Sequence, residues 1–153
     1  MDGNKDKGLE LSALGKYRFF DVTADVGYWA YGENINTAFE NGSTAMFEVI
    51  TSTKDIEDNF SEEFSIDSED LESLLYDYLE ELLYRHEVNF RLYNKFQIKI
   101  KPSTEGYHLD AHIEGDNINW DKYERRGEIK AITFHQMKIE TRTPSKIRVI
   151  LDI

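Results

Sequence analysis

The stretch from residue 70 to residue 84, DLESLLYDYLEELLY, constrains the fold of this chain more than any other. Its apolar side chains recur at steps of three and four, which places them in one stripe along an α-helix. They are Leu71, Leu74, Leu75, Tyr78, Leu79, Leu82 and Leu83. Acidic residues fill most of the opposite side, and Asp67 or Ser68 is predicted to cap the start. The pattern predicts a core helix with an acidic, solvent-facing side.

The net charge of the chain, -12 at pH 7, is unevenly distributed along the sequence. Residues 55–81 contain 12 of the 30 acidic residues and no Lys or Arg, whereas 12 of the 18 basic residues lie from residue 91 onward. The net negative charge argues against direct binding of a nucleic acid backbone, which requires clustered cations. The acidic surface either serves solubility alone or docks a basic partner, and the sequence leaves both interpretations open.

The composition excludes several classes of site. There are no cysteines, so disulfides, zinc fingers, iron–sulfur clusters and thiol nucleophiles are ruled out. The chain shows no secretory signal and no apolar run long enough to span a membrane, so we expect a cytoplasmic protein. Its 153 residues suit one domain. We predict a flexible tail over residues 1–16 and a single domain over residues 17–153.

The remaining segments predict an α+β fold, with two amphipathic helices packed on a largely antiparallel β-sheet. The second helix is expected after Asn34, over residues 35–50, with Gly42 allowing close approach of another element. Extended segments are predicted at residues 17–23, 26–32, 62–66, 88–93, 95–101, 107–113, 128–140 and 146–153. Residues 128–140 carry apolar side chains on both parities, which predicts a central strand covered on both faces.

Two acidic residues are candidate metal ligands. Asp25 lies between two extended segments, and Asp152 directly precedes Ile153, which carries the α-carboxylate. Three such oxygen donors together suit Ca²⁺ or Mg²⁺, although a turn-forming Asp25 and a solvated terminal acid explain the same residues without a metal. His108 and His112 share one strand face about 13 Å apart, too far to ligate one ion.

No pattern typical of a catalytic site is present. The chain contains no phosphate-binding glycine loop, no nucleophile elbow and no HExxH helix. Lys130 lies among apolar neighbours on a predicted strand, where it either meets an anion or reaches solvent. We therefore predict no catalytic residues and an accessory role rather than an enzyme.

The chain resembles the archease family. The matching stretches are TADVG at residues 23–27, AFEN and AMFEVI within 38–50, the 70–84 helix, EIKAITFHQM at 128–137 and VILDI at 149–153. Each stretch alone is weak, but together they occur in the family's order over most of the chain.

This resemblance implies that the protein is a non-enzymatic activator of the RtcB-type RNA ligase in tRNA splicing. Activators of this family promote formation of the ligase–guanylate intermediate and multiple turnover, and they bind a divalent ion, typically calcium. The residues implied as ligands are Asp25, Asp152 and Ile153. Lys130 and Asp25 are implied in activation of the ligase, and tRNA is implied only as an indirect partner.

One position departs from the family pattern. The residue before TAD is usually His, and here it is Val22, which raises the question of a weaker or rearranged site. Two other functions stay open at this stage. A chaperone-like interaction module for nucleic-acid-processing proteins would dock through Asp77, Glu80 and Glu81, and a divalent-metal hydrolase would require Asp25 for turnover.

Overall fold

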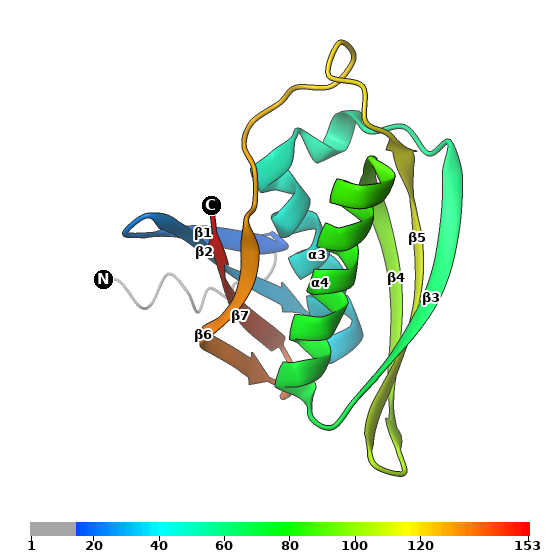
Figure 1. The fold of residues 1–153 in the computed structure, drawn as a ribbon. Helices are drawn as coiled ribbons and strands as arrows, with labels where there is room; N and C mark the ends of the chain where they lie inside the picture. The colour runs from blue at the N-terminus through cyan, green and yellow to red at the C-terminus, as the bar shows by residue number, and fades with distance from the viewer. Residues whose placement is uncertain (1–14) are drawn as a thin grey trace.

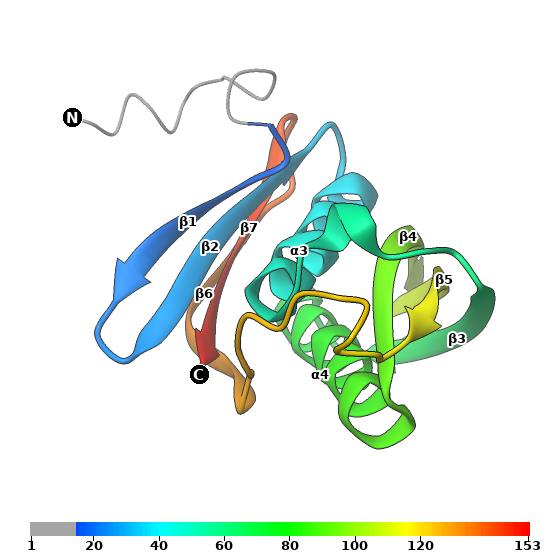
Figure 2. The ribbon, with the colours of Figure 1, turned by 90° about the horizontal axis from the view of Figure 1, so that it is seen from above.

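The computed structural model describes residues 15–153 and has three layers, with the helices between two antiparallel sheets (Figures 1 and 2). Apart from residues 15 and 16, the predicted tail lies outside the described residues. The expected α+β class is confirmed, but the strands divide into two sheets rather than forming one. In the described part of the chain, no helix is long and apolar enough to cross a membrane.

Sheet A has four strands and sheet B has three. Sheet A runs in the order β1 (Tyr17–Val22), β2 (Asp25–Gly32), β7 (Ser145–Asp152) and β6 (Ala131–Glu140). Sheet B runs in the order β3 (Phe60–Ser68), β5 (Gly106–Asn117) and β4 (Arg91–Ser103). Chain segments far apart in sequence therefore become neighbours, above all β2 and β7.

The two helices form where the sequence predicts them, with one difference in capping. Helix α3 (Ile35–Ile50) begins after Asn34, whose side chain accepts a hydrogen bond from the Thr37 amide at 3.0 Å. Helix α4 (Leu71–Asn89) is capped by Asp70, not by Asp67 or Ser68, through a 2.8 Å bond from the Ser73 amide. Both caps satisfy an amide that has no partner within the helix. A short 3₁₀ helix, η1 (Thr53–Asp55), follows α3.

The core fills the space between the inner faces of the sheets and the helices. Helix α3 contacts β2 and β4, whereas α4 contacts β6 and β3, so each helix bridges both sheets. The buried hydroxyls of Ser43 on α3 and Tyr78 on α4 lie 2.6 Å apart and join the two helices. A side chain at Gly42 would collide with Ile147 of β7, which confirms the predicted close approach at this glycine.

Polar side chains of α3 protect the edge of sheet B. The Asn36 side chain accepts a hydrogen bond from the Ile100 amide at 2.9 Å, and Glu40 accepts one from the Ile98 amide at 2.8 Å. Both amides belong to β4, an edge strand whose outer backbone groups lack a neighbouring strand. The helix thus covers an edge that would otherwise be open to pairing with another chain.

Two predicted strands differ from the structure. The segment predicted as a central strand at 128–140 is the edge strand β6, which begins at Ala131 and is interrupted between Thr133 and Lys138. Its apolar residues change parity because the interruption shifts the side-chain alternation, and Phe134 is left 53% exposed. Residues 88–93 were predicted as extended, yet α4 continues to Asn89 and the chain turns at Phe90 in the left-handed region, with φ 58°.

The long loop after β5 is held by specific contacts. Buried Tyr123 donates a 2.5 Å hydrogen bond to Asp116 and accepts one from the Glu57 amide. Burial alone would raise the pKa of Asp116, but the bond from Tyr123 and its other hydrogen bonds lower it to about 2. The Arg126 amide donates to the carbonyl oxygen of Ile50 at the end of α3. The loop therefore ends where β6 begins, beside the carboxyl end of β7.

Candidate functional site

Asp25 and Asp152 meet across sheet A. Asp25 is the first residue of β2 and pairs directly with Asp152 of the antiparallel neighbour β7. Directly opposed residues place their side chains on the same face with Cβ atoms about 4.5–5.5 Å apart. That face is the outer one, because the alternate residues Tyr28 and Val149 point into the core. Two half-buried carboxylates therefore lie side by side on a solvent-facing sheet.

Lys130 and Ile153 adjoin this pair of carboxylates. The Lys130 amide donates a 2.7 Å hydrogen bond to the Asp152 carbonyl oxygen, and the next residue, Ala131, pairs with Asp152 in the sheet. The Lys130 side chain is exposed and forms no ion pair with another described residue, in agreement with the solvent-reaching interpretation. Ile153 directly follows the pair and is 43% exposed. All four predicted site residues thus gather at one end of sheet A.

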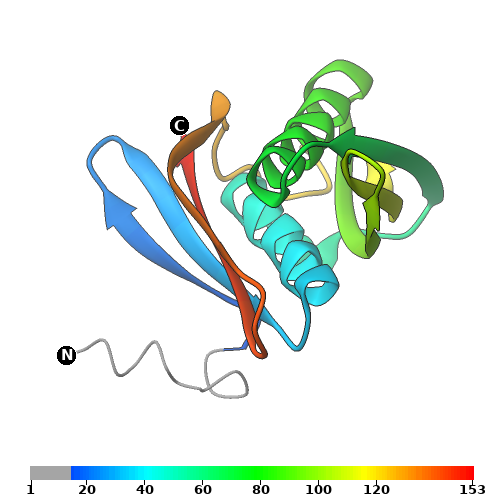
Figure 3. The same ribbon diagram turned by 90° about the horizontal axis from the view of Figure 1, so that it is seen from below.

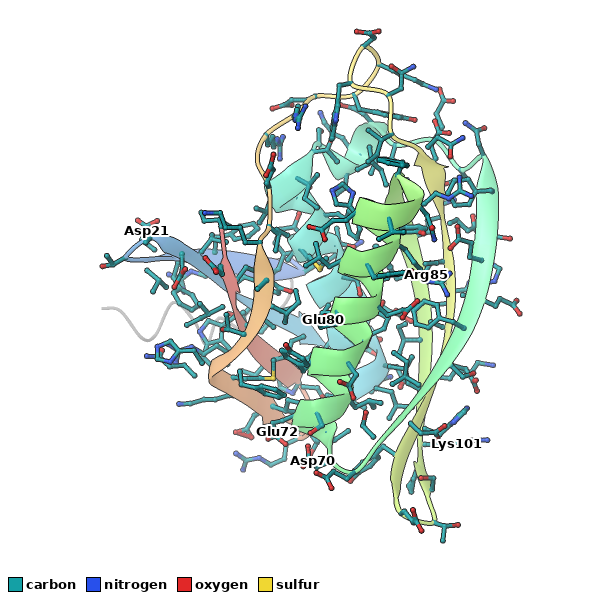
Figure 4. All side chains as sticks on the ribbon, viewed as in Figure 1. Asp21, Asp70, Glu72, Glu80, Arg85 and Lys101 are labelled. Carbon is teal, nitrogen blue, oxygen red and sulfur yellow. The ribbon has the colours of Figure 1, made fainter. Side chains whose placement is uncertain are left out.

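The register also defines the place of Val22. It lies directly opposite Asp25 on β1, so one row crosses the sheet through Val22, Asp25, Asp152 and Ala131; we call it the acid row. Asp21 pairs with Val26 and so belongs to the other face, as the strand alternation predicts. Figure 4 shows Asp21 near the tip of the β1–β2 hairpin. Asp21 therefore cannot replace a histidine missing at Val22.

The acid row has the donor chemistry of a hard-cation site. Within residues 15–153, neither Asp25 nor Asp152 forms a side-chain hydrogen bond or ion pair with another described residue. Like charges placed directly opposite one another repel, and a divalent cation removes that cost. No group of three or more His, Asp or Glu side chains suited to a metal occurs among the described residues.

The outer face of sheet A holds a second set of residues that the sequence analysis missed. Arg18 of β1, Trp29 of β2, Arg148 of β7 and Lys138 of β6 lie in register, in a row we call the basic row. The available signals were Arg18 among the aromatic residues of 17–20 and the two cations at alternate positions, Lys146 and Arg148. The sequence does not state which strands are neighbours, so three cations from three strands could not be placed together.

Other candidates from the sequence lie elsewhere. His108 and His112 are on the outer face of sheet B, where each ring lies between two carboxylates rather than beside the other histidine. On α4, Asp77 accepts a hydrogen bond from Ser68, and Glu81 pairs with Arg85. Figure 4 shows Arg85 on the side of α4 toward sheet B, and it also reaches Glu62 of β3 at 2.6 Å. Several acids of the helix are thus already paired within the protein.

Comparison with known proteins identifies the relatives of this chain. A model of the Archease protein family (MTH1598/TM1083) matches residues 17–153. The protein archease of Methanothermobacter thermautotrophicus is 47% identical over 138 residues, covering 90% of this chain and 98% of the relative. The protein archease of Sulfurisphaera tokodaii is 42% identical over 129 residues, covering 84% of this chain and 91% of the relative.

A solved structure shares the fold. The solution structure of Methanobacterium thermoautotrophicum protein 1598 matches with a TM-score of 0.79 and 46% sequence identity, over 90% of this chain and 98% of that one. The matched region contains both sheets and both helices of the described structure. The family match and the fold agree with the motifs at residues 23–27 and 149–153 that form the acid row. The chain belongs to the archease family.

Proposed function

We propose that this protein is an accessory activator of an RtcB-type RNA ligase, acting through the acid row and a divalent cation, and that it is not itself an enzyme. The single observation that carries this proposal is the direct pairing of Asp25 with Asp152 on the outer face of sheet A. Residues from both ends of the domain meet there, and the site is built by two strands of the sheet rather than by a flexible loop. Such a site presents its carboxylates at a defined spacing.

Asp25, Asp152 and the main-chain carboxylate at Ile153 would hold the cation, preferably calcium. All the donors are hard oxygens, and calcium tolerates irregular coordination geometry. When bound, the ion offsets the repulsion between the carboxylates and offers its remaining coordination positions to a partner. The protein's own groups keep the carboxylates at the surface and in register.

Lys130 lies in position to contact the same partner. Its backbone is held by the 2.7 Å bond to Asp152, while its side chain is exposed. The exposed Lys130 side chain thus adds a positive charge at the end of sheet A that carries the paired carboxylates. We propose that Asp25 and Lys130 engage the phosphate-binding active site of the ligase and favour its guanylylation; tRNA takes part only as the substrate of the ligase.

The test is multiple-turnover ligation by the cognate RtcB-type ligase with and without this protein. We expect the wild type to stimulate turnover and formation of the ligase–guanylate intermediate, and Asp25→Ala to lose most of that stimulation. Asp21→Ala is the matched control, because it removes a carboxylate from the same hairpin on the opposite face. Lys130→Ala should retain cation binding but lower stimulation.

The outcomes discriminate among the alternatives. Unchanged guanylylation and turnover on adding the wild-type protein would contradict the proposal. Equal stimulation by wild type and Asp25→Ala would keep the partner but move the contact away from the acid row. A chaperone-like module docking through α4 predicts the loss of binding on neutralising Asp77, Glu80 and Glu81, and it receives less support because Asp77 and Glu81 already have partners within the chain.

A further inference from the structure

The basic row concentrates positive charge on a protein whose net charge is -12. Arg18, Arg148 and Lys138 come from three of the four strands, and Trp29 lies between the two arginines. Lys146, two residues before Arg148 on β7, adds a fourth cation to this face, with its Nζ 4.8 Å from the Trp29 centroid. The Arg148 guanidinium lies 5.5 Å from that centroid. Two cations of β7 therefore lie over the Trp29 ring.

A second ring extends this surface toward the acid row. Phe20 pairs with Gly27, and a Cβ atom at Gly27 would overlap the Phe20 ring, so the ring lies over the bare backbone of β2. The Arg148 guanidinium is 5.0 Å from the Phe20 centroid and so contacts both aromatic side chains. A hollow of about 180 Å³ opens here, lined by Arg18, Phe19, Phe20, Trp29 and Arg148. Its walls offer both ring faces and guanidinium groups.

The cations of β6 and β7 are not neutralised within the described residues. Lys138, Lys146 and Arg148 form no ion pair there, and Arg148 donates only to the neutral side chain of Gln136. Elsewhere in the same structure most arginines are paired; Arg85, Arg91 and Arg126 each contact a carboxylate. Arg148 differs from these arginines in having no carboxylate partner within the described residues, which leaves it available to an anionic ligand.

The face that carries these residues is open in the described structure. Both helices and sheet B lie on the inner side of sheet A (Figures 2 and 3). A sheet face that holds half-buried rings beside half-buried cations suits an extended, unpaired chain of bases. Cations contact the phosphates and rings stack on the bases, which requires bases that are not already paired in a duplex.

We infer that the outer face of sheet A binds single-stranded nucleic acid, with Arg18, Lys146 and Arg148 on phosphates and Trp29 and Phe20 on bases. The acidic composition argued against such binding, but three strands in register create a cation cluster that the composition conceals. An acidic peptide would use the same cations and leave the rings unused. The inference does not depend on the proposed function, because the acid row lies about 13 Å away along the strands.

The test measures fluorescence anisotropy of a fluorescein-labelled single-stranded RNA about a dozen nucleotides long, titrated with the full chain at about 50 mM salt. Saturable binding is expected, and with three phosphate contacts it should weaken about 10- to 20-fold between 50 and 200 mM salt. In a Trp120→Phe background, Trp29 is the one remaining tryptophan. Its emission should be quenched on binding, because the bases stack on it.

Matched charge reversals locate the surface. Lys146→Glu should weaken binding about 10-fold or more, whereas Lys101→Glu should change it less than about twofold. Both variants replace a lysine by glutamate and so change the net charge equally. Lys101 is exposed near the β4–β5 hairpin of sheet B, away from the basic row (Figure 4). Trp29→Leu should weaken binding by about 10-fold through loss of stacking. Circular dichroism checks that each variant is folded. If Trp29→Leu does not fold, the comparison of Lys146→Glu with Lys101→Glu still tests the binding surface.

Three results would overturn the inference. The first is the absence of saturable RNA binding at low salt. The second is equal weakening by Lys146→Glu and Lys101→Glu, which would mean non-specific attraction. The third is polyglutamate binding as tightly as RNA with no change in Trp29 emission, which would assign the face to an acidic peptide. Ligase stimulation is measured separately, so failure here leaves the proposed function standing.

Discussion

On the outer face of sheet B, each histidine of β5 lies between two carboxylates, whereas on the outer face of sheet A Asp25 and Asp152 oppose each other directly. Both faces are solvent-exposed surfaces of antiparallel sheets with charged alternate positions. Sheet B alternates the sign of its charges, so each histidine has partners within the sheet. Sheet A separates the signs into an acid row and a basic row, so the two carboxylates of the acid row have a like charge as their direct neighbour.

This difference in charge arrangement indicates which of the two outer faces would gain more from binding an ion. A charged group with partners of opposite sign on its own sheet gains little from an external ion. Opposed like charges cost energy in the isolated protein and lose that cost on binding a counter-ion. By this criterion we propose the outer face of sheet A, rather than that of sheet B, as the ligand-binding face. The following predictions test that contrast.

The largest expected effect comes from glycines at matched places in the two sheets. A Cβ atom at Gly115 in sheet B would overlap the Leu92 carbonyl oxygen of the β4 backbone, which cannot move without breaking the sheet. Gly115→Ala should lower the free energy of unfolding by about 3 kcal/mol or more. Gly27→Ala in sheet A meets only the far end of the Phe20 ring, and it should cost about 1 kcal/mol or less.

Chemical denaturation measures both glycine variants. Equal losses of stability would show that Phe20 is as firmly held as a backbone strand, and would remove the argument that its ring is an adaptable part of an open surface.

Calcium should stabilise the protein through sheet A alone. At a calcium concentration about 100 times the dissociation constant, binding adds about 2.7 kcal/mol, which is about 5–10 °C in Tm for a domain of this size. Asp25→Asn should abolish this shift, and without calcium it should slightly raise Tm because the repulsion with Asp152 is relieved. Thermal unfolding with added calcium or with chelator measures both effects.

Asp67→Asn is the control for the calcium experiment. It removes an exposed carboxylate from the outer face of sheet B, where it pairs with His108 at 2.7 Å. Its calcium-dependent shift should equal that of the wild type even if its baseline Tm is lower. A shift that survives in Asp25→Asn would place the ion outside the acid row.

The smallest effect concerns the histidines of sheet B. Hydrogen bonds to Asp67 and then Asp110 raise the pKa of His108, and bonds to Glu63 and then Glu114 raise that of His112. Because the folded pKa lies above the unfolded value, the stabilisation is fully present below about pH 6.5 and is lost as pH rises through the folded pKa values. Replacing both histidines by Gln should therefore lower Tm at about pH 6 more than at about pH 9.

Thermal unfolding across this pH range checks the prediction. His135→Gln is the matched control, since His135 is exposed on β6 and has no carboxylate partner among the described residues. A pH-independent difference between wild type and the double variant would mean that the histidines contribute packing rather than charge.

Much of the fold follows from local patterns. The stripe from Leu71 to Leu83 and the cap at Asn34 predicted both helices, because a helix forms from contacts three and four residues apart. The alternation of Phe96, Ile98 and Ile100 predicted the inward face of β4 for the same kind of reason. The edge position of residues 131–140 could not be predicted from the sequence. The interruption after Thr133 changes which side chains face inward, and this gives the same apolar pattern as a strand that is buried on both faces.

The candidate site shows the same division. The residues alone predicted both helices, most strands and the family, and they marked Asp25, Asp152 and Lys130 as candidates whose roles the family resemblance then implied. The strand register of the folded protein was needed to place Asp25 opposite Asp152 and Val22 in the same row. It was also needed to bring Arg18, Arg148 and Lys138 together in the basic row. The reason is that strand alternation is local, whereas the order and register of strands depend on long-range packing against the helices.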